Sequence, residues 1–137
     1  MVCTIRSARL LLAPRTAHPL AAVETRVLPR PGWTLVALAG RLDMNSAGPL
    51  EQQLEALIGA GDRHLAIDLS SLDYLSSAGL RALLVAARRL QEAGGTLALI
   101  GLRGTVKEVL EIAGLANVLP CYTDEHELLA ARPEWAR

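Results

Sequence analysis

The segment DLSSLDYLSSAGL, residues 68–80, decides the fold of this 137-residue chain. It closes a short apolar run that begins at His64, and such a run is typical of a strand covered on both sides. A polar turn then leads into a helix that opens with Ser76 and Ser77. A buried strand that runs into an amphipathic helix predicts one unit of an α/β layer architecture.

The rest of the chain repeats this alternation of strands and helices. The apolar segments 23–29 and 33–40 flank Arg30-Pro31-Gly32, and this turn chemistry predicts a hairpin. The next predicted elements are a helix capped by Ser46 that ends near Gly59, the strand 64–69, and the helix that opens with Ser76 and Ser77 and runs up to Gly94. They are followed by the strand 96–102 and by a helix opened by the capping-box spacing of Thr105 and Glu108. The last predicted elements are a short strand in 118–122 and a helix starting at residues 123–125. Together they predict a single domain with a mixed, mostly parallel sheet of about five strands and about four helices.

The predicted domain spans residues 23–131, between two segments of other character. Residues 1–22 are expected to be a disordered extension, or an extension that results from a wrongly assigned translation start, because Pro14 and Pro19 interrupt any helix there. The apolar run before Pro14 is too short for a secretory segment or for direct insertion into a membrane. Residues 132–137 are expected to form a C-terminal tail.

The composition argues against several classes of partner and cofactor. Basic and acidic residues number 14 each, and the chain has no Phe, two Trp and two Tyr, which argues against nucleic-acid binding. Two cysteines at opposite ends and three isolated histidines form no metal spacing and no disulfide framework. We therefore expect a cytoplasmic protein with no metal and no cofactor.

Two enzyme hypotheses have weak support in the sequence. Asp43, Asp68 and Asp73 follow or end predicted strands and would form a magnesium or acid/base site if they converged. The loop 101–105 precedes a helix but lacks the lysine of a P-loop, and neither serine of the turn lies in a G-x-S-x-G elbow. The sequence thus predicts no catalytic residues.

The serine pair lies where an anion is stabilised. The first turn of a helix carries unpaired N–H groups and the positive end of the helix dipole. Neither Ser76 nor Ser77 is followed three residues later by Glu or Gln, so the capping box is absent and either hydroxyl is a candidate cap. A hydroxyl beside the small residues Ala78 and Gly79 suits a kinase or a partner surface.

Across residues 23–131 the chain resembles the STAS-domain anti-sigma factor antagonists. The resemblance rests on Gly40-Arg41-Leu42-Asp43, on the strand end Asp68-Leu69-Ser70, on residues 74–80, and on the late segments 101–102 and 108–114. It implies a non-enzymatic regulator that binds an anti-sigma factor serine kinase when unphosphorylated and is released on phosphorylation, while a serine phosphatase restores the binding form.

Carried over by position, the phosphorylated residue is Ser77. Family members often have Asp immediately before this serine, whereas this chain has Ser76, which is the alternative site. The surface implied for partner binding comprises Asp43, Asn45, Asp73, Ser76, Ser77 and Arg81. The departure at Ser76 also leaves a second reading, a non-phosphorylated STAS subunit of a lipid or anion transport complex.

Overall fold

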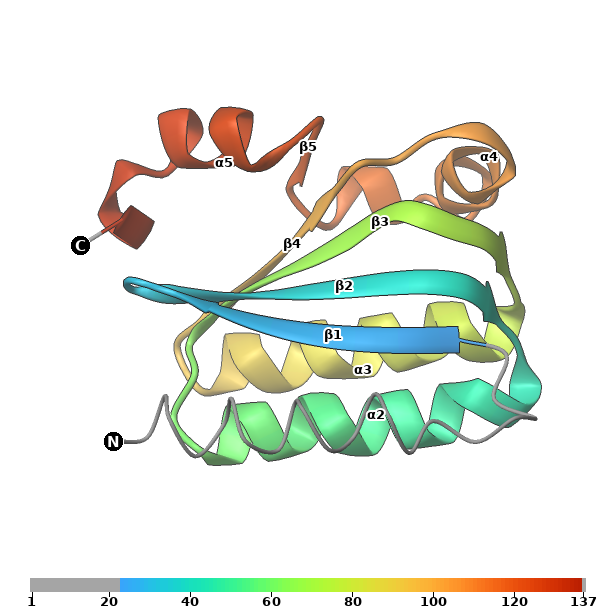
Figure 1. Ribbon diagram of the computed structural model, residues 1–137, viewed down its shortest axis with the longest axis horizontal. Helices are drawn as coiled ribbons and strands as arrows, with labels where there is room; N and C mark the ends of the chain where they lie inside the picture. Colours follow the sequence, from blue (N-terminus) through green and yellow to red (C-terminus); the bar gives the residue numbers. More distant parts are fainter. Residues whose placement is uncertain (1–22, 137) are drawn as a thin grey trace.

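The structure, a computed structural model, describes residues 23–136, which form a five-stranded sheet in the order β1-β2-β3-β4-β5 (Figure 1). The strands are β1 (Val23–Arg30), β2 (Trp33–Leu42), β3 (His64–Leu75), β4 (Thr96–Ile100) and β5 (Cys121–Tyr122); the helices are α2 (Met44–Gly59), α3 (Ser77–Glu92), α4 (Gly104–Ile112) and α5 (Glu125–Ala131), with short 3-10 turns η1 (Leu115–Asn117) and η2 (Pro133–Ala136). Only β1 runs antiparallel to its neighbour. The predicted fold class is confirmed, and the expectation for residues 1–22 lies outside the described residues.

Helices α2 and α3 lie side by side against one face of the sheet (Figure 1). Leu54 and Leu83 from these helices are fully buried in one aliphatic cluster with Ile67 of β3. Helix α4 adds Leu110 to the same cluster. Each leucine buried in this way contributes about 1.5–3 kcal/mol, so this face holds most of the stabilising apolar contact.

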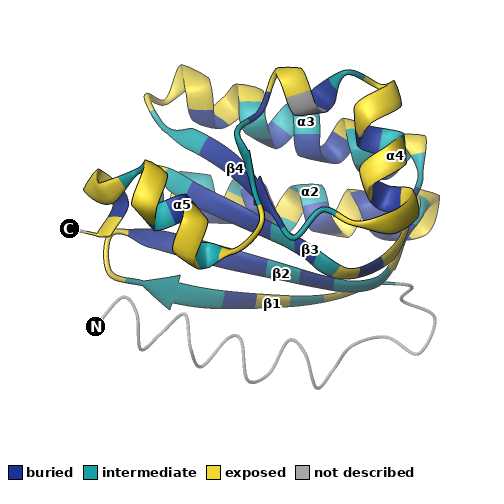
Figure 2. Cartoon of the chain, turned by 90° about the horizontal axis from the view of Figure 1, so that it is seen from above, coloured by how far each residue is buried: buried dark blue, intermediate teal, exposed yellow. Residues whose placement is uncertain are grey.

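Helix α5 covers the opposite face of the sheet (Figure 2), where residues of the sheet, α5 and η2 form a smaller cluster, the aromatic cluster, that contains Trp33 and Trp135. Trp135, in the segment expected to be a C-terminal tail, is fully buried there. Its ring stacks on His64 at a centroid distance of 4.8 Å and lies 6.0 Å from the ring of Trp33. Burial lowers the pKa of His64, against the attraction of the nearby Glu134 carboxylate, so this contact favours the neutral imidazole.

Strand β3 is longer than the sequence predicts. The segment 70–75, expected to be a polar turn, continues as strand to Leu75. Leu72 and Leu75 face the core, and two register shifts against β2 accommodate extra residues on β3. Because β4 ends opposite Asp68, the second half of β3 pairs with β2 alone, which explains its polar composition.

Two helix starts also differ from the prediction. Helix α2 begins at Met44 with Asp43 as its cap, and Ser46 lies in its first turn instead of capping it. Helix α4 begins at Gly104 after Arg103, and no side chain caps it, so the predicted capping box at Thr105 is wrong.

Candidate functional site

Helices α2 and α3 begin next to each other at one edge of the sheet. Leu42, the last residue of β2, is the register partner of Leu75, the last residue of β3. The residues that follow, Asp43 and Ser76, are the N-caps of the two helices. Ser76 also donates its backbone N–H to the Leu42 carbonyl at 2.9 Å, and neighbouring strands lie about 4.8 Å apart. The sheet register therefore places the two caps side by side.

Asp43 closes the start of α2 with its carboxylate. One carboxylate oxygen accepts the backbone N–H groups of Asn45 at 3.0 Å and Ser46 at 3.1 Å, and the Ser46 hydroxyl lies 3.1 Å from the same oxygen. Burial alone would raise the pKa of Asp43, but these hydrogen bonds, helped by the charge of Arg41, outweigh it and lower the pKa. Asp43 is therefore an anion at neutral pH.

At the start of α3 the two serines have different roles. The half-buried Ser76 hydroxyl accepts the backbone N–H of Gly79 at 3.1 Å, so Ser76 is the cap. Ser77 is the first residue of the helix and is exposed, and no residue in the part of the chain that the structure describes hydrogen-bonds its hydroxyl. This answers the question that the sequence leaves open, because Ser76 caps the helix and Ser77 presents an exposed hydroxyl.

Gly79 brings the helix start close to the strand ends. A Cβ at this position would lie 2.6 Å from Leu42 Cγ and 3.0 Å from Leu75 Cδ1. Because carbon atoms cannot approach so closely, any side chain here would push α3 away from β2. The glycine thus sets the height of Ser77 above the edge of the sheet.

The other predicted partner-binding residues are Asn45, Arg81 and Asp73, and each lies within a few residues of one of the two helix caps. Asn45 is exposed in the first turn of α2, and Arg81 is exposed four residues after Ser77, hence on the same side of α3. Asp73 is exposed and is the extra residue of β3 between the pairs Leu72–Gly40 and Tyr74–Arg41. The bulge turns this carboxylate outward shortly before the serines.

Three exposed residues beside the serines escaped the sequence analysis. Arg41 places its guanidinium carbon 4.3 Å from the ring centroid of Tyr74, and both side chains are exposed. Met44, the first residue of α2, is 79% exposed. The available signal for Met44 was an apolar side chain in the polar stretch before the predicted cap Ser46, whereas the sequence predicts a turn at Tyr74.

The three carboxylates of the enzyme hypothesis do not converge. Asp68 lies seven residues before the end of β3, roughly 20 Å along the strand from the Asp43 edge, and it accepts the backbone N–H of Ser70 at 2.9 Å. Within residues 23–136, no group of three or more His, Cys, Asp or Glu side chains has a geometry that would hold a metal ion.

The loop after β4 is also a poor phosphate site. A Cβ on Gly101 would lie 2.9 Å from the Asp68 carboxylate and 2.8 Å from Ser70 Cβ, so the loop is packed against β3 beside a negative charge. Arg103 donates its Nε hydrogen to the Ser70 carbonyl, which uses the cation nearest to the loop. A phosphate there would face the carboxylate.

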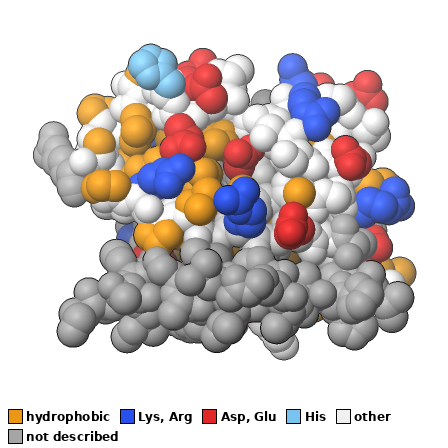
Figure 3. Space-filling view, in the orientation of Figure 1, with side chains coloured by type: hydrophobic (Ala, Val, Ile, Leu, Met, Phe, Trp, Pro, Cys, Tyr) orange, Lys and Arg blue, Asp and Glu red, His pale blue; other side chains and the backbone are white. Residues whose placement is uncertain are grey.

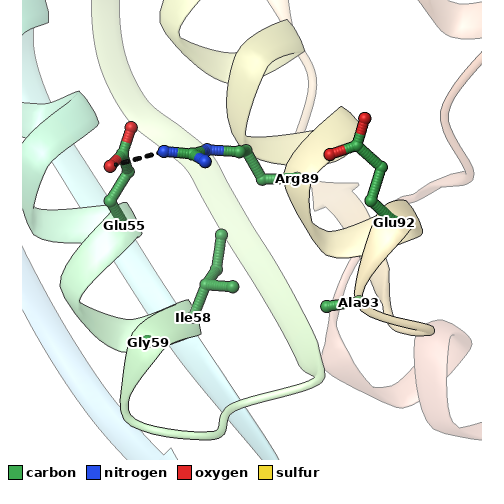
Figure 4. Close-up of a pocket in the computed structure, with 6 residues that line it drawn as sticks. All are labelled: Glu55, Ile58, Gly59, Arg89, Glu92 and Ala93. Carbon is green, nitrogen blue, oxygen red and sulfur yellow. Dashed lines mark ion pairs between the residues drawn. The ribbon is translucent and has the colours of Figure 1, made fainter.

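A hollow on the surface lies far from the serines, between the last turns of α2 and α3 (Figure 4). Glu55 and Arg89 span it with an ion pair of 2.9 Å. Arg89 follows Ser77 by twelve residues, about 18 Å along the helix. The hollow is therefore separate from the edge that carries the serines.

The visible surface has no field of a single sign. Figure 3 shows acidic and basic side chains mixed across one face, with apolar side chains gathered toward α5. This pattern agrees with the balanced charge of the chain and differs from the basic face that binds polyanions. In the stretch 23–136 no helix has both the length and the apolar character needed to cross a bilayer.

Comparisons with known proteins agree on one family. A family model described as "Mlab, STAS domain" matches residues 30–120. BtrV of Bordetella bronchiseptica, described as a candidate anti-sigma factor antagonist, is 37% identical over 100 residues, covering 73% of this chain and 86% of that protein. The anti-sigma F factor antagonist of Paenibacillus polymyxa is 27% identical over 95 residues, covering 69% and 81%.

A solved structure gives the same result. The anti-sigma factor antagonist from Mycobacterium paratuberculosis superimposes with a TM-score of 0.73 and 28% identity, covering 82% of this chain and 97% of that one. These relatives are named as regulators and not as enzymes. The chain belongs to the STAS-domain family of anti-sigma factor antagonists.

Proposed function

We propose that this protein is a cytoplasmic anti-sigma factor antagonist that works by partner switching, with Ser77 as the regulatory residue. The observation that carries the proposal is the division of labour at the start of α3: Ser76 holds the helix cap, and Ser77 offers an exposed hydroxyl with no hydrogen-bond partner among the described residues. A kinase reaches Ser77 without breaking the helix start.

The unphosphorylated protein binds an anti-sigma factor with serine-kinase activity through the edge where α2 and α3 begin. Asp43, Asn45, Asp73, Ser76, Ser77 and Arg81 form the polar part of this surface. Exposed Met44 and Tyr74 add the apolar and aromatic side chains that interfaces favour. The names of the relatives support the partner class.

Phosphorylation of Ser77 releases the partner, for two reasons. A phosphate adds about −1.5 to −2 charges and fills the space in which the partner would bury a neutral hydroxyl. It also lies near the ionised Asp43 carboxylate, so the edge becomes strongly acidic. The N–H groups of the first turn of α3 stabilise the phosphate, so the modified chain stays folded while it loses its partner. A serine phosphatase restores the binding form.

The experiment measures binding of the cognate anti-sigma factor kinase by calorimetry. Ser77→Ala retains binding and Ser77→Asp loses it. The matched control is Gln91→Glu, which adds one negative charge at an exposed position near the other end of α3, outside this surface, and so retains binding. Equal binding by Ser77→Ala and Ser77→Asp would rule out the switch at this residue.

A second measurement identifies the modified serine. After incubation with the kinase and ATP, mass spectrometry of the intact chain and its peptides is expected to find one phosphate, on Ser77. Phosphate on Ser76 would move the switch to the alternative residue.

A second candidate function follows from Ser76, which stands where family members often have Asp. In this reading the chain is a non-phosphorylated STAS subunit of a lipid or anion transport complex. It predicts a chain that stays unmodified in the kinase assay and co-purifies with membrane components. Co-purification with the kinase favours the first function.

A further inference from the structure

Strand β1 forms one margin of the sheet (Figure 2). Among residues 23–136 it pairs only with β2. An outer strand presents a row of N–H and C=O groups that can template another strand. The identity of a suitable strand depends on which groups point outward and which side chains accompany them.

The hairpin geometry identifies the outward groups. Arg30 and Trp33 flank the two-residue turn, so they are a hydrogen-bonded pair, and hydrogen-bonded pairs alternate along antiparallel strands. Glu24, Arg26 and Leu28 therefore bond to β2, while the residues whose backbone groups point outward are Val23, Thr25, Val27 and Pro29. Pro29 has no N–H to offer.

The side chains of residues 23–27 read Val-Glu-Thr-Arg-Val, an order that complements itself when reversed. Glu24 and Arg26 are exposed, and the structure shows neither in an ion pair with a described residue. We propose that β1 pairs with β1 of a second copy of this chain, antiparallel and about a two-fold axis through Thr25. The two sheets then form one continuous sheet.

In this register every opposing pair among residues 23–27 is favourable. Thr25 faces Thr25, and Val23 faces Val27 of the second copy, so outward backbone groups meet outward groups. Glu24 faces Arg26 twice, because the interface is two-fold symmetric. Val23 and Val27 pack against the aliphatic cluster on the α2 side, so apolar contact continues from one copy to the next.

The neighbouring registers are unfavourable. A two-fold axis at Arg26 sets Arg26 against itself, and an axis at Glu24 sets Glu24 against itself, so like charges face each other. An axis at Val27 brings Pro29 opposite Thr25, where the missing N–H breaks the ladder. The sequence of this strand therefore selects the register centred on Thr25.

Charges on outer strands usually prevent pairing between copies. Here the two charges have opposite signs at positions that meet in the favoured register, so they attract. The strand segment is short and the contact small, which makes the dimer weak and dependent on concentration. The dimer contact lies on β1 and does not involve the surface around Ser77, so the proposal is independent of the role of Ser77.

The test is sedimentation velocity of the full chain from micromolar to millimolar concentration, where the wild type is expected to shift from monomer toward dimer. Glu24→Arg and Arg26→Glu each place like charges opposite each other and weaken the dimer by about tenfold or more. An equimolar mixture of these two variants pairs again, because each copy then supplies the charge that the other needs. The double swap Glu24→Arg with Arg26→Glu restores the homodimer.

A backbone variant tests the ladder itself. Thr25→Pro removes an outward N–H that β2 does not use and abolishes the dimer, while Thr25→Ala keeps the N–H and retains it. Circular dichroism checks that each variant is folded. A wild type that stays monomeric at every concentration overturns the proposal, whatever binds the outer side of β1. A dimer whose stability does not change with the charge of residue 26 overturns it too. Binding of the anti-sigma factor by these variants is a separate readout.

Discussion

The starts of α2 and α3 lie side by side after paired strands, yet one is closed and the other open. At α2 a carboxylate takes the N–H groups of Asn45 and Ser46, and the Ser46 hydroxyl is drawn into the same network. At α3 the Ser76 hydroxyl takes the N–H group of Gly79, while the hydroxyl of the next serine is exposed and bonds to no described residue. The fold places two equivalent helix ends at one edge, and the capping residue decides which of them has room for an added anion.

A substitution at Gly79 is expected to give the largest difference between the two helices. Gly79→Ala drives a methyl group into Leu42 and Leu75, and we expect a loss of about 1–3 kcal/mol in the free energy of unfolding. Gly59→Ala, in α2, meets no atom within 4 Å and is expected to be neutral or to gain up to about 1 kcal/mol. Urea unfolding of both variants measures the difference, and equal stabilities would show that α3 does not need its close approach to β2.

The capping residues give the next largest effect. Ser76→Ala removes one hydrogen bond and is expected to cost about 1 kcal/mol. Asp43→Ala removes bonds to two N–H groups and is expected to lower the stability further. Hydrogen exchange locates the loss: the amides of Asn45 and Ser46 exchange faster in Asp43→Ala, and that of Gly79 in Ser76→Ala. An Asp43→Ala chain more stable than Ser76→Ala would contradict the contrast.

Lowering the pH tests the difference between the two helix caps without a substitution at α3. The pKa of Asp43 is lower in the folded chain than the ordinary value of 3.8, so its contribution is complete above that value and is lost as the pH falls through the folded pKa. NMR is expected to show the Asn45 and Ser46 amides shifting below pH 4 while the Gly79 amide, capped by a hydroxyl, stays in place. The response at α2 disappears in Asp43→Asn. An equal shift at Gly79 would mean that the two starts titrate together.

The smallest effect is that of a new charge at the first residue of each helix. Ser77→Asp is expected to raise the free energy of unfolding by about 0.3–1 kcal/mol through the helix dipole. Met44→Asp gains less, because the Asp43 carboxylate already occupies that helix start. Thermal melts at low ionic strength measure both, and a larger gain for Met44→Asp would reverse the assignment of open and closed.

Apolar periodicity predicted the hairpin, the helices and the parallel sheet, because leucines and valines recur with the period of the element that buries them. It failed for residues 70–75, where only one neighbouring strand remains and the exposed Asp73 and Tyr74 resemble a turn. The serine pair was predicted as the site, but the division between cap and free hydroxyl depends on where β3 ends. Met44 escaped notice because exposure cannot be read from a single residue.

Both tryptophans of the chain, Trp33 and Trp135, lie in the aromatic cluster on the face opposite α2 and α3. Intrinsic fluorescence therefore reports on the last turn of the chain and its contact with His64, and it is blind to events at Ser77. A label for following partner exchange has to be introduced on the α2 side of the molecule. A tag attached directly after residue 137 begins three residues beyond the fully buried indole of Trp135. An assay that relies on intrinsic fluorescence, or on a tag directly after residue 137, would report on the surroundings of Trp135 and not on Ser77.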